Sequence, residues 1–156
     1  MIFTAFAFYV FAISVINKKV NKIHIDILVV LYFVVVIGLS FFKSIHNFTG
    51  MNLNPFNIIN EFRSYFQHTL FLVVSNLLIY LPLGIFVRFK MKVNNSKLII
   101  GFLLYILLIE TMQYVSHTGI FDINDIILNT LGFHIGIYSY NLIHTHVRNY
   151  KEKSIC

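Results

Sequence analysis

Five apolar stretches, separated by short polar segments, constrain this chain more than any other feature of its sequence. A helix that crosses the hydrocarbon layer of a membrane needs about 20 predominantly apolar residues. Four of the stretches approach or reach that length, and the shorter first one is followed by lysines that can extend to the headgroups. The sequence therefore predicts an all-α fold, a polytopic transmembrane helical bundle of about five spans. The spans are residues 2–16, 23–42, 70–89, 98–115 and 123–143.

The composition excludes most soluble classes of protein. Only 12% of the 156 residues are charged and 58% are hydrophobic, whereas about a quarter of the residues of a soluble domain are charged. This composition excludes a soluble enzyme and a disordered chain. A disulfide scaffold is excluded as well, since the one cysteine is Cys156 and has no partner within the chain. We interpret residues 1–156 as a single membrane domain.

The basic residues predict the orientation of the bundle. Ten of the 12 Lys and Arg residues follow the first, third and fifth apolar stretches, and only Lys43 and Arg63 lie on the other side. Because positive charge concentrates in cytoplasmic loops, we expect the N-terminus outside the cell and the C-terminus in the cytoplasm. The net charge of +6 is then a topology signal, and we expect no nucleic-acid partner.

The segment of residues 52–66 differs from the other connections. Asn54 can cap a helix and Pro55 can occupy its first position. Downstream, apolar residues such as Phe56 and Ile59 recur at helical spacing with polar residues between them. This pattern predicts a short amphipathic helix in the outer interface, and an ordered loop is the alternative.

Polar side chains interrupt the last three spans, where an acidic group costs about 2.5–3.5 kcal/mol at the membrane centre. At a rise of about 1.5 Å per residue, one residue from each span lies roughly 10 Å below the outer surface, and two more lie one turn above. Helical phase places these groups on facing stripes. The sequence therefore predicts a polar pocket that opens outward. The three residues at the same depth are Asn76, Glu110 and Asn129. Gln113 and Asp125 lie one turn above them, and Asp122 lies at the start of the last span.

These polar residues also have structural interpretations. Asp122 is a candidate N-cap of the last span, with Asp125 in its first turn. Asn76, Gln113 and Asn129 are candidates for hydrogen bonds between helices. Glu110 is harder to explain in this way, because no Lys or Arg lies at its depth. Its carboxyl group must be protonated, hydrogen-bonded or bound to a cation.

Small residues and one proline predict where the helices approach closely. Gly132 and Gly136 are four residues apart, as in a face that packs against another helix. Pro82 and Gly84 in the third span are typical of a kink and a close-packing point.

Four motifs follow one another along the chain: Asn52-Leu53-Asn54-Pro55-Phe56, Asn76 with Pro82-Leu83-Gly84, Glu110-x-x-Gln113, and Asp122-x-x-Asp125-x-x-x-Asn129-x-x-Gly132. Together these motifs resemble the VanZ-like family of small bacterial membrane proteins. The resemblance covers about residues 50 to 140 and implies a multi-pass protein of the bacterial cytoplasmic membrane. The founding member of that family is associated with resistance to the glycopeptide teicoplanin, which implies a related process here.

Together these features favour a non-enzymatic envelope protein. We expect the outward pocket to bind a lipid-linked cell-wall precursor or a lipoglycopeptide within the lipid bilayer. No cofactor is required, although Glu110 and Asp125 offer hard oxygen ligands to a divalent cation. Three alternatives stay open. The first is a membrane enzyme that acts on a lipid-linked cell-wall precursor with Glu110 or Asp125 as general base. The second is a small proton-coupled transporter in which they relay protons, and the third is a purely structural partner of another membrane protein. The oligomeric state is open as well.

Overall fold

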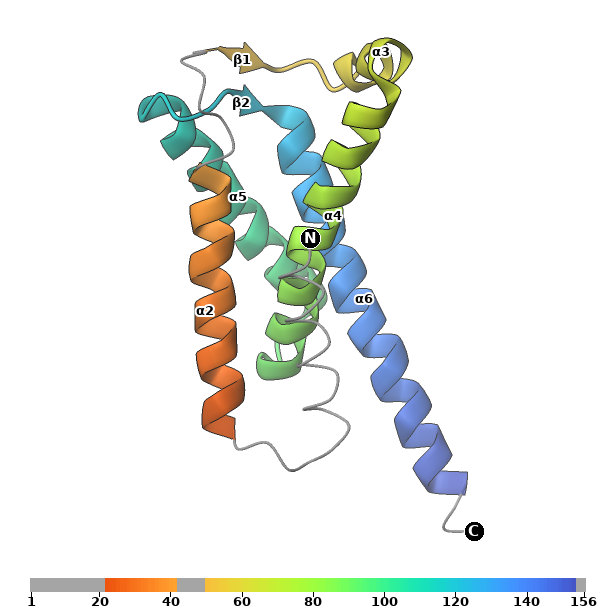
Figure 1. The fold of residues 1–156 in the computed structure, drawn as a ribbon. Coiled ribbons are helices and arrows are strands. Elements are labelled where there is room, and N and C mark those ends of the chain that lie inside the picture. Colours follow the sequence, from red (N-terminus) through yellow and green to blue (C-terminus); the bar gives the residue numbers. More distant parts are fainter. Residues whose placement is uncertain (1–21, 42–49, 154–156) are drawn as a thin grey trace.

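The computed structural model describes residues 22–41 and 50–153, most of which are helical (Figure 1). This architecture confirms the predicted all-α class, with only two short strands among the described residues. The predicted span at residues 2–16 lies outside the described residues. The elements are α2 (Lys22–Phe41), β1 (Met51–Asn52), α3 (Asn57–Ser64), α4 (Phe66–Lys90), α5 (Asn95–Val115), β2 (Phe121–Asp122) and α6 (Ile123–Lys153).

Three of the described helices are long and apolar enough to cross a membrane, namely α4, α5 and the Ile123–Tyr150 part of α6. Helix α2 contains a shorter apolar segment, Val29–Gly38. Helices α4 and α6 are longer than predicted, because α4 begins at Phe66 and α6 continues to Lys153. Hydropathy marks only the part of a helix that suits lipid, while the backbone hydrogen bonds of α6 continue through a polar segment that contains no Gly or Pro.

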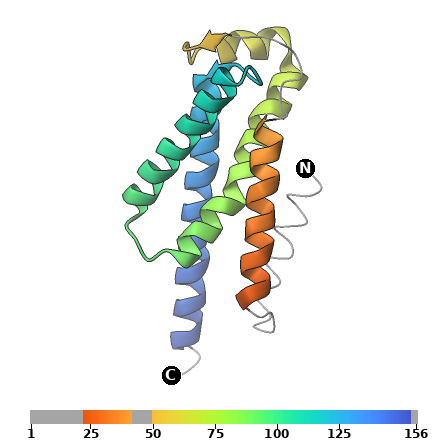
Figure 2. The ribbon, with the colours of Figure 1, turned by 90° about the vertical axis from the view of Figure 1, so that its left-hand side faces the viewer.

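Among the described helices, α4 and α6 form the most extensive contact, and the contact of α5 with α6 is the next most extensive. Both ribbon views show that the last turns of α6 extend beyond the ends of the other helices (Figures 1 and 2). At the opposite end, β1 and β2 form a parallel pair in which Met51 is opposite Phe121 and Asn52 is opposite Asp122. We call the end of the bundle that carries β1, β2 and α3 the strand end.

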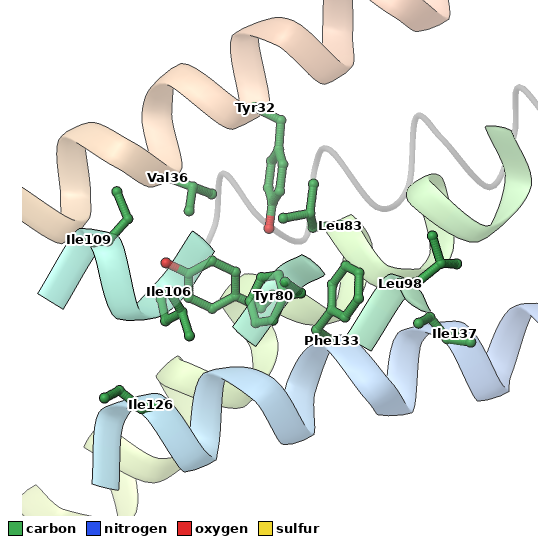
Figure 3. Close-up of a cluster of buried hydrophobic side chains, with 11 residues drawn as sticks. Tyr32, Val36, Tyr80, Leu83, Leu98, Ile106, Ile109, Ile126, Phe133 and Ile137 are labelled. Atoms are coloured by element: carbon green, nitrogen blue, oxygen red, sulfur yellow. The ribbon is translucent and has the colours of Figure 1, made fainter. Parts of the chain in front are cut away.

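Aromatic and aliphatic side chains from all four long helices fill the space between them (Figure 3). Phe102 of α5 stacks on Phe133 of α6 with ring centroids 4.1 Å apart. Tyr80 of α4 meets Phe102 edge-on at 5.2 Å. Buried apolar packing is therefore continuous across α4, α5 and α6, with Tyr32 and Val36 closing it from α2.

Glycines let α4 and α6 approach until their backbones touch. A Cβ atom on Gly84 would lie 2.1 Å from the carbonyl oxygen of Phe133, and one on Gly136 would lie 2.1 Å from that of Leu81. At Gly132 the nearest atom would be the carbonyl oxygen of Leu77, at 2.4 Å. No larger residue fits at these three positions without separating the helices. The glycine face predicted on the last span is thus the face that contacts α4.

Pro82 lies inside α4, which continues through it to Lys90. A proline has no N–H, so the carbonyl group of Leu78 has no partner at the usual position four residues later. The neighbouring carbonyl, of Ile79, accepts a hydrogen bond from the hydroxyl group of Tyr32. This bond attaches α2 to α4 at the point where the helical hydrogen bonding of α4 is interrupted.

Candidate functional site

The connection between α5 and α6 begins with a tight reversal at the end of α5. The N–H of His117 donates to the carbonyl of Tyr114 (3.2 Å), and the N–H of Thr118 donates to that of Gln113 (3.0 Å). With His117 at a φ of 56°, this is the Schellman arrangement, in which the residue after the cap is left-handed. The reversal places Gly119 against the buried side chain of Gln113, since a Cβ atom on that glycine would lie 3.4 Å from the Cβ of Gln113.

Asp122 is the last residue before α6, and its carboxylate caps that helix. Oδ1 accepts a hydrogen bond from the N–H of Asn124 at 2.8 Å, as an N-cap side chain does. The side-chain amide of Asn52 lies 3.3 and 3.2 Å from the two carboxylate oxygens. Asp122 therefore ends the α5–α6 connection and also attaches β1 to the start of α6.

A chain of asparagine amides continues from Asn52 into α3. The amide of Asn57 donates to Oδ1 of Asn52 at 2.7 Å, and the amide of Asn54 donates to Oδ1 of Asn57 at 3.1 Å. Sequence analysis did not include Asn52 and Asn57 in the site, although the asparagine spacing within residues 52–57 was a signal. These bonds join the start of α3 to the start of α6.

The predicted cap of the amphipathic helix is shifted. Oδ1 of Asn54 accepts from the N–H of Phe56 at 3.0 Å, which is a turn stabilised by an asparagine side chain. Helix α3 begins at Asn57, so Pro55 lies in this turn and does not occupy the first helical position. The helix itself is present, as an eight-residue element within the predicted segment of residues 52–66.

A hydrogen bond between the side chains of Asn76 and Asp125 joins α4 to α6. Nδ2 of Asn76 donates to Oδ1 of Asp125 at 2.7 Å, and Asn76 is buried. The sequence-based depths placed Asn76 beside Asn129 and Asp125 one turn higher. The observed pairing is one turn nearer the start of α6, because depth counted along each helix separately ignores how the helices cross.

Glu110 of α5 is only 3% exposed. Its Oε2 lies 3.4 Å from the backbone N of Asp122, at the start of α6. Asp125 is in the first turn of the same helix. Three carboxylates therefore surround one helix N-terminus, where the unpaired N–H groups and the helix dipole favour negative charge.

Asn129 has a buried carbonyl oxygen without a partner. The residue is 5% exposed, and its Oδ1 has no hydrogen-bond partner in the structure. It lies one turn after Asp125, which contacts α4, and one turn before Phe133, which stacks on α5. A buried acceptor without a donor costs about 1–3 kcal/mol.

We call these side chains at the strand end the polar cluster. The structure brings Asn76 to Asp125 and Glu110 to the backbone of Asp122, while ligand binding by any of them stays a prediction. Four hydrogen-bonded contacts, one helix cap and one unpaired acceptor thus occupy a region of a few turns. The polar cluster consists of Asn52, Asn57, Asn76, Glu110, Gln113, Asp122, Asp125 and Asn129.

The predicted divalent cation would need oxygen ligands from Glu110 and Asp125. Across residues 22–41 and 50–153, no three or more His, Cys, Asp or Glu side chains are grouped so that they could hold a metal ion. Main-chain and amide oxygens would have to complete such a site, which is chemically suitable for a hard cation. A cation at these two carboxylates stays a prediction.

Comparison with known proteins supplies the context for this cluster. A profile of the VanZ/LLP1 family matches residues 29–144. The protein named Protein VanZ of Enterococcus faecium is 29% identical over 133 residues, which are 80% of this chain and 78% of that protein. No solved structure matches the chain significantly.

Proposed function

The chain belongs to the VanZ/LLP1 family, and from that membership we propose that it is an integral membrane protein of the bacterial cell envelope that contributes to resistance to teicoplanin. In this proposal the polar cluster binds a lipid-linked or lipid-anchored ligand at the strand end. The family match includes every residue of the polar cluster, from Asn52 to Asn129. Its relative in Enterococcus faecium carries the VanZ name, which supports the process without defining a reaction.

The distribution of basic residues supports an orientation for this role. Arg88 and Lys90 end α4, and Lys97 lies in the first turn of α5, at the end of the bundle opposite the strands. Arg63 of α3 is the one Lys or Arg that the described part of the chain carries at the strand end. Because cytoplasmic loops carry the excess of positive charge, the strand end faces the cell exterior of the cytoplasmic membrane, where cell-wall precursors and lipoglycopeptides are found.

The observation that carries the proposal is the burial of an ionisable side chain and of an unpaired carbonyl oxygen in the polar cluster. Glu110 is 3% exposed in a helix that is apolar enough to cross a membrane, and the carbonyl oxygen of Asn129 has no donor. At position 129 an apolar side chain of similar size would avoid the cost of the unpaired oxygen. Ionisable groups kept inside a membrane protein usually serve binding or transfer.

Drug susceptibility of a sensitive Gram-positive host tests the proposal. The host would express the chain, its Asp125→Asn variant, or an empty vector, at matched membrane abundance. Asn at position 125 still offers an oxygen to the amide of Asn76, so the variant removes charge while it keeps the contact between α4 and α6. We expect the chain to raise the inhibitory concentration of teicoplanin and the variant to return it to that of the empty vector.

Two controls separate binding from general effects. Tyr32→Phe removes the hydrogen bond to Ile79, outside the polar cluster, and is expected to keep full protection. A glycopeptide without an acyl chain should be resisted less than teicoplanin if a lipid anchor is what the cluster recognises. Equal protection by the chain and by Asp125→Asn would remove the polar cluster from the function, and no protection by either would reject the proposed role in resistance.

A further inference from the structure

Helix α3 and its flanking residues expose large apolar side chains at the strand end. The helix has no buried residue, and it runs across the strand end while α4 descends from it (Figure 2). Phe56 before the helix and Tyr65 after it are both 70% exposed. We call this group the α3 apolar surface, and its members are Leu53, Phe56, Ile59, Tyr65 and Phe66.

The α3 apolar surface is continuous with the exposed apolar side of α4. Phe66 is the first residue of α4, and Leu70, Phe71 and Val74 are exposed along the following turns. Since α4 is long and apolar enough to span a membrane, these side chains of α4 face lipid. A group of aromatic side chains directly beside that surface would be costly in water.

The charges of α3 indicate what holds this surface at the membrane. Glu61 and Arg63 are both exposed and cancel each other in net charge. Attraction to anionic headgroups is therefore small, and burial of apolar area is the main source of binding. Asn57 at the start of α3 donates to Asn52, which in turn donates to Asp122, so the first turn of α3 is bonded to the polar cluster.

The geometry points to an interfacial role for α3: the α3 apolar surface inserts into the acyl-chain boundary of the leaflet at the strand end, with lipid chains as its partner. The asparagine bonds then hold the polar cluster at the level of the headgroups. A ligand with a lipid anchor would reach the cluster sideways, from within the leaflet. The insertion itself does not depend on the identity of any ligand, and so it stands apart from the role in resistance.

The chain contains no tryptophan, which allows a direct measurement of depth. The full-length Phe56→Trp variant would be reconstituted into phosphatidylcholine vesicles that contain lipids brominated near the headgroup or near the chain end. We expect blue-shifted emission, strong quenching by the shallow bromines and weak quenching by aqueous iodide.

Glu61→Trp is the matched control, because position 61 lies on the opposite side of α3 from Phe56 and Ile59 at 100° per residue. Its emission should be red-shifted and quenched by iodide. Ile59→Trp repeats the test on the apolar side and should agree with Phe56→Trp. If both apolar-side variants are quenched by iodide as strongly as Glu61→Trp and are unaffected by brominated lipids, α3 lies in water and the inference is wrong.

Discussion

Between Leu77 and Ile85, α4 contacts α6 backbone to backbone at three glycines, whereas at Asn76 the same two helices are joined by a side-chain hydrogen bond. The glycine contact depends on shape alone, and lipid offers it no competing partner. The contact at the strand end depends on donors and acceptors, which a ligand or water can also satisfy. The first region can therefore hold the helices in place while the second exchanges partners.

The largest expected effect comes from adding a side chain at the glycine contact between α4 and α6. Gly136→Ala places a Cβ atom 2.1 Å from the carbonyl oxygen of Leu81, and the backbone there has no rotamer with which to move away. We expect a loss of about 3 kcal/mol or failure to fold, measured as thermal stability of the purified protein in detergent. Gly101→Ala is the control, since nothing lies within 4 Å of its Cβ position; similar losses in both would show that helix contact is not the cause.

A smaller effect is expected from the hydrogen bond at the strand end. Asn76→Leu removes the donor that lies 2.7 Å from Oδ1 of Asp125 and leaves that carboxylate less satisfied, at a cost of about 2 kcal/mol. Asp125→Asn keeps an acceptor for Asn76 and should cost clearly less in the same thermal assay. If Asn76→Leu is as stable as the unsubstituted chain, the pair contributes nothing to helix association.

The smallest of the three effects is expected at the start of α6, where two substitutions of Asp122 distinguish the stability that comes from the helix cap from the stability that comes from its negative charge. Asp122→Ala removes the acceptor for the N–H of Asn124 and should cost about 1 kcal/mol. Asp122→Asn retains a capping oxygen and should recover most of that stability. Equal losses in both variants would mean that the negative charge beside the helix N-terminus, and not the cap, stabilises α6.

The regularities that predicted the fold are local ones. Apolar stretches marked α2, α4, α5 and most of α6, and the spacing of Gly132 and Gly136 identified the face of α6 that contacts α4. Helical spacing also placed an amphipathic helix within residues 52–66. Each of these patterns depends on residues a few positions apart, so the chain displays them whatever its tertiary contacts are.

The polar cluster was only partly predictable. Asn76, Glu110 and Asp125 were recognised because polar groups are rare in spans. Their depths placed Asn76 and Glu110 level with Asn129, whereas Asn76 bonds Asp125, about one turn nearer the start of α6, and Glu110 bonds the backbone of Asp122, about two turns nearer. Asn52 and Asn57 were not included in the site, because it is the pairing of β1 with β2 that brings Asn52, and Asn57 bonded to it, to Asp122. Asn52 and Asp122 are 70 positions apart in the chain, and their contact follows from the way in which β1 and β2 meet.

The sequence by itself determined that this chain is a helical membrane protein and which of its helices are apolar. It also determined which side chains are too polar to lie in lipid without a hydrogen-bonding partner. Only the tertiary structure decided which partner each of them has. Hydropathy and helical phase report the environment that a residue needs. The pairing of Asp122 with Asn52, and the unpaired oxygen of Asn129, depend instead on how whole helices cross and where two short strands meet.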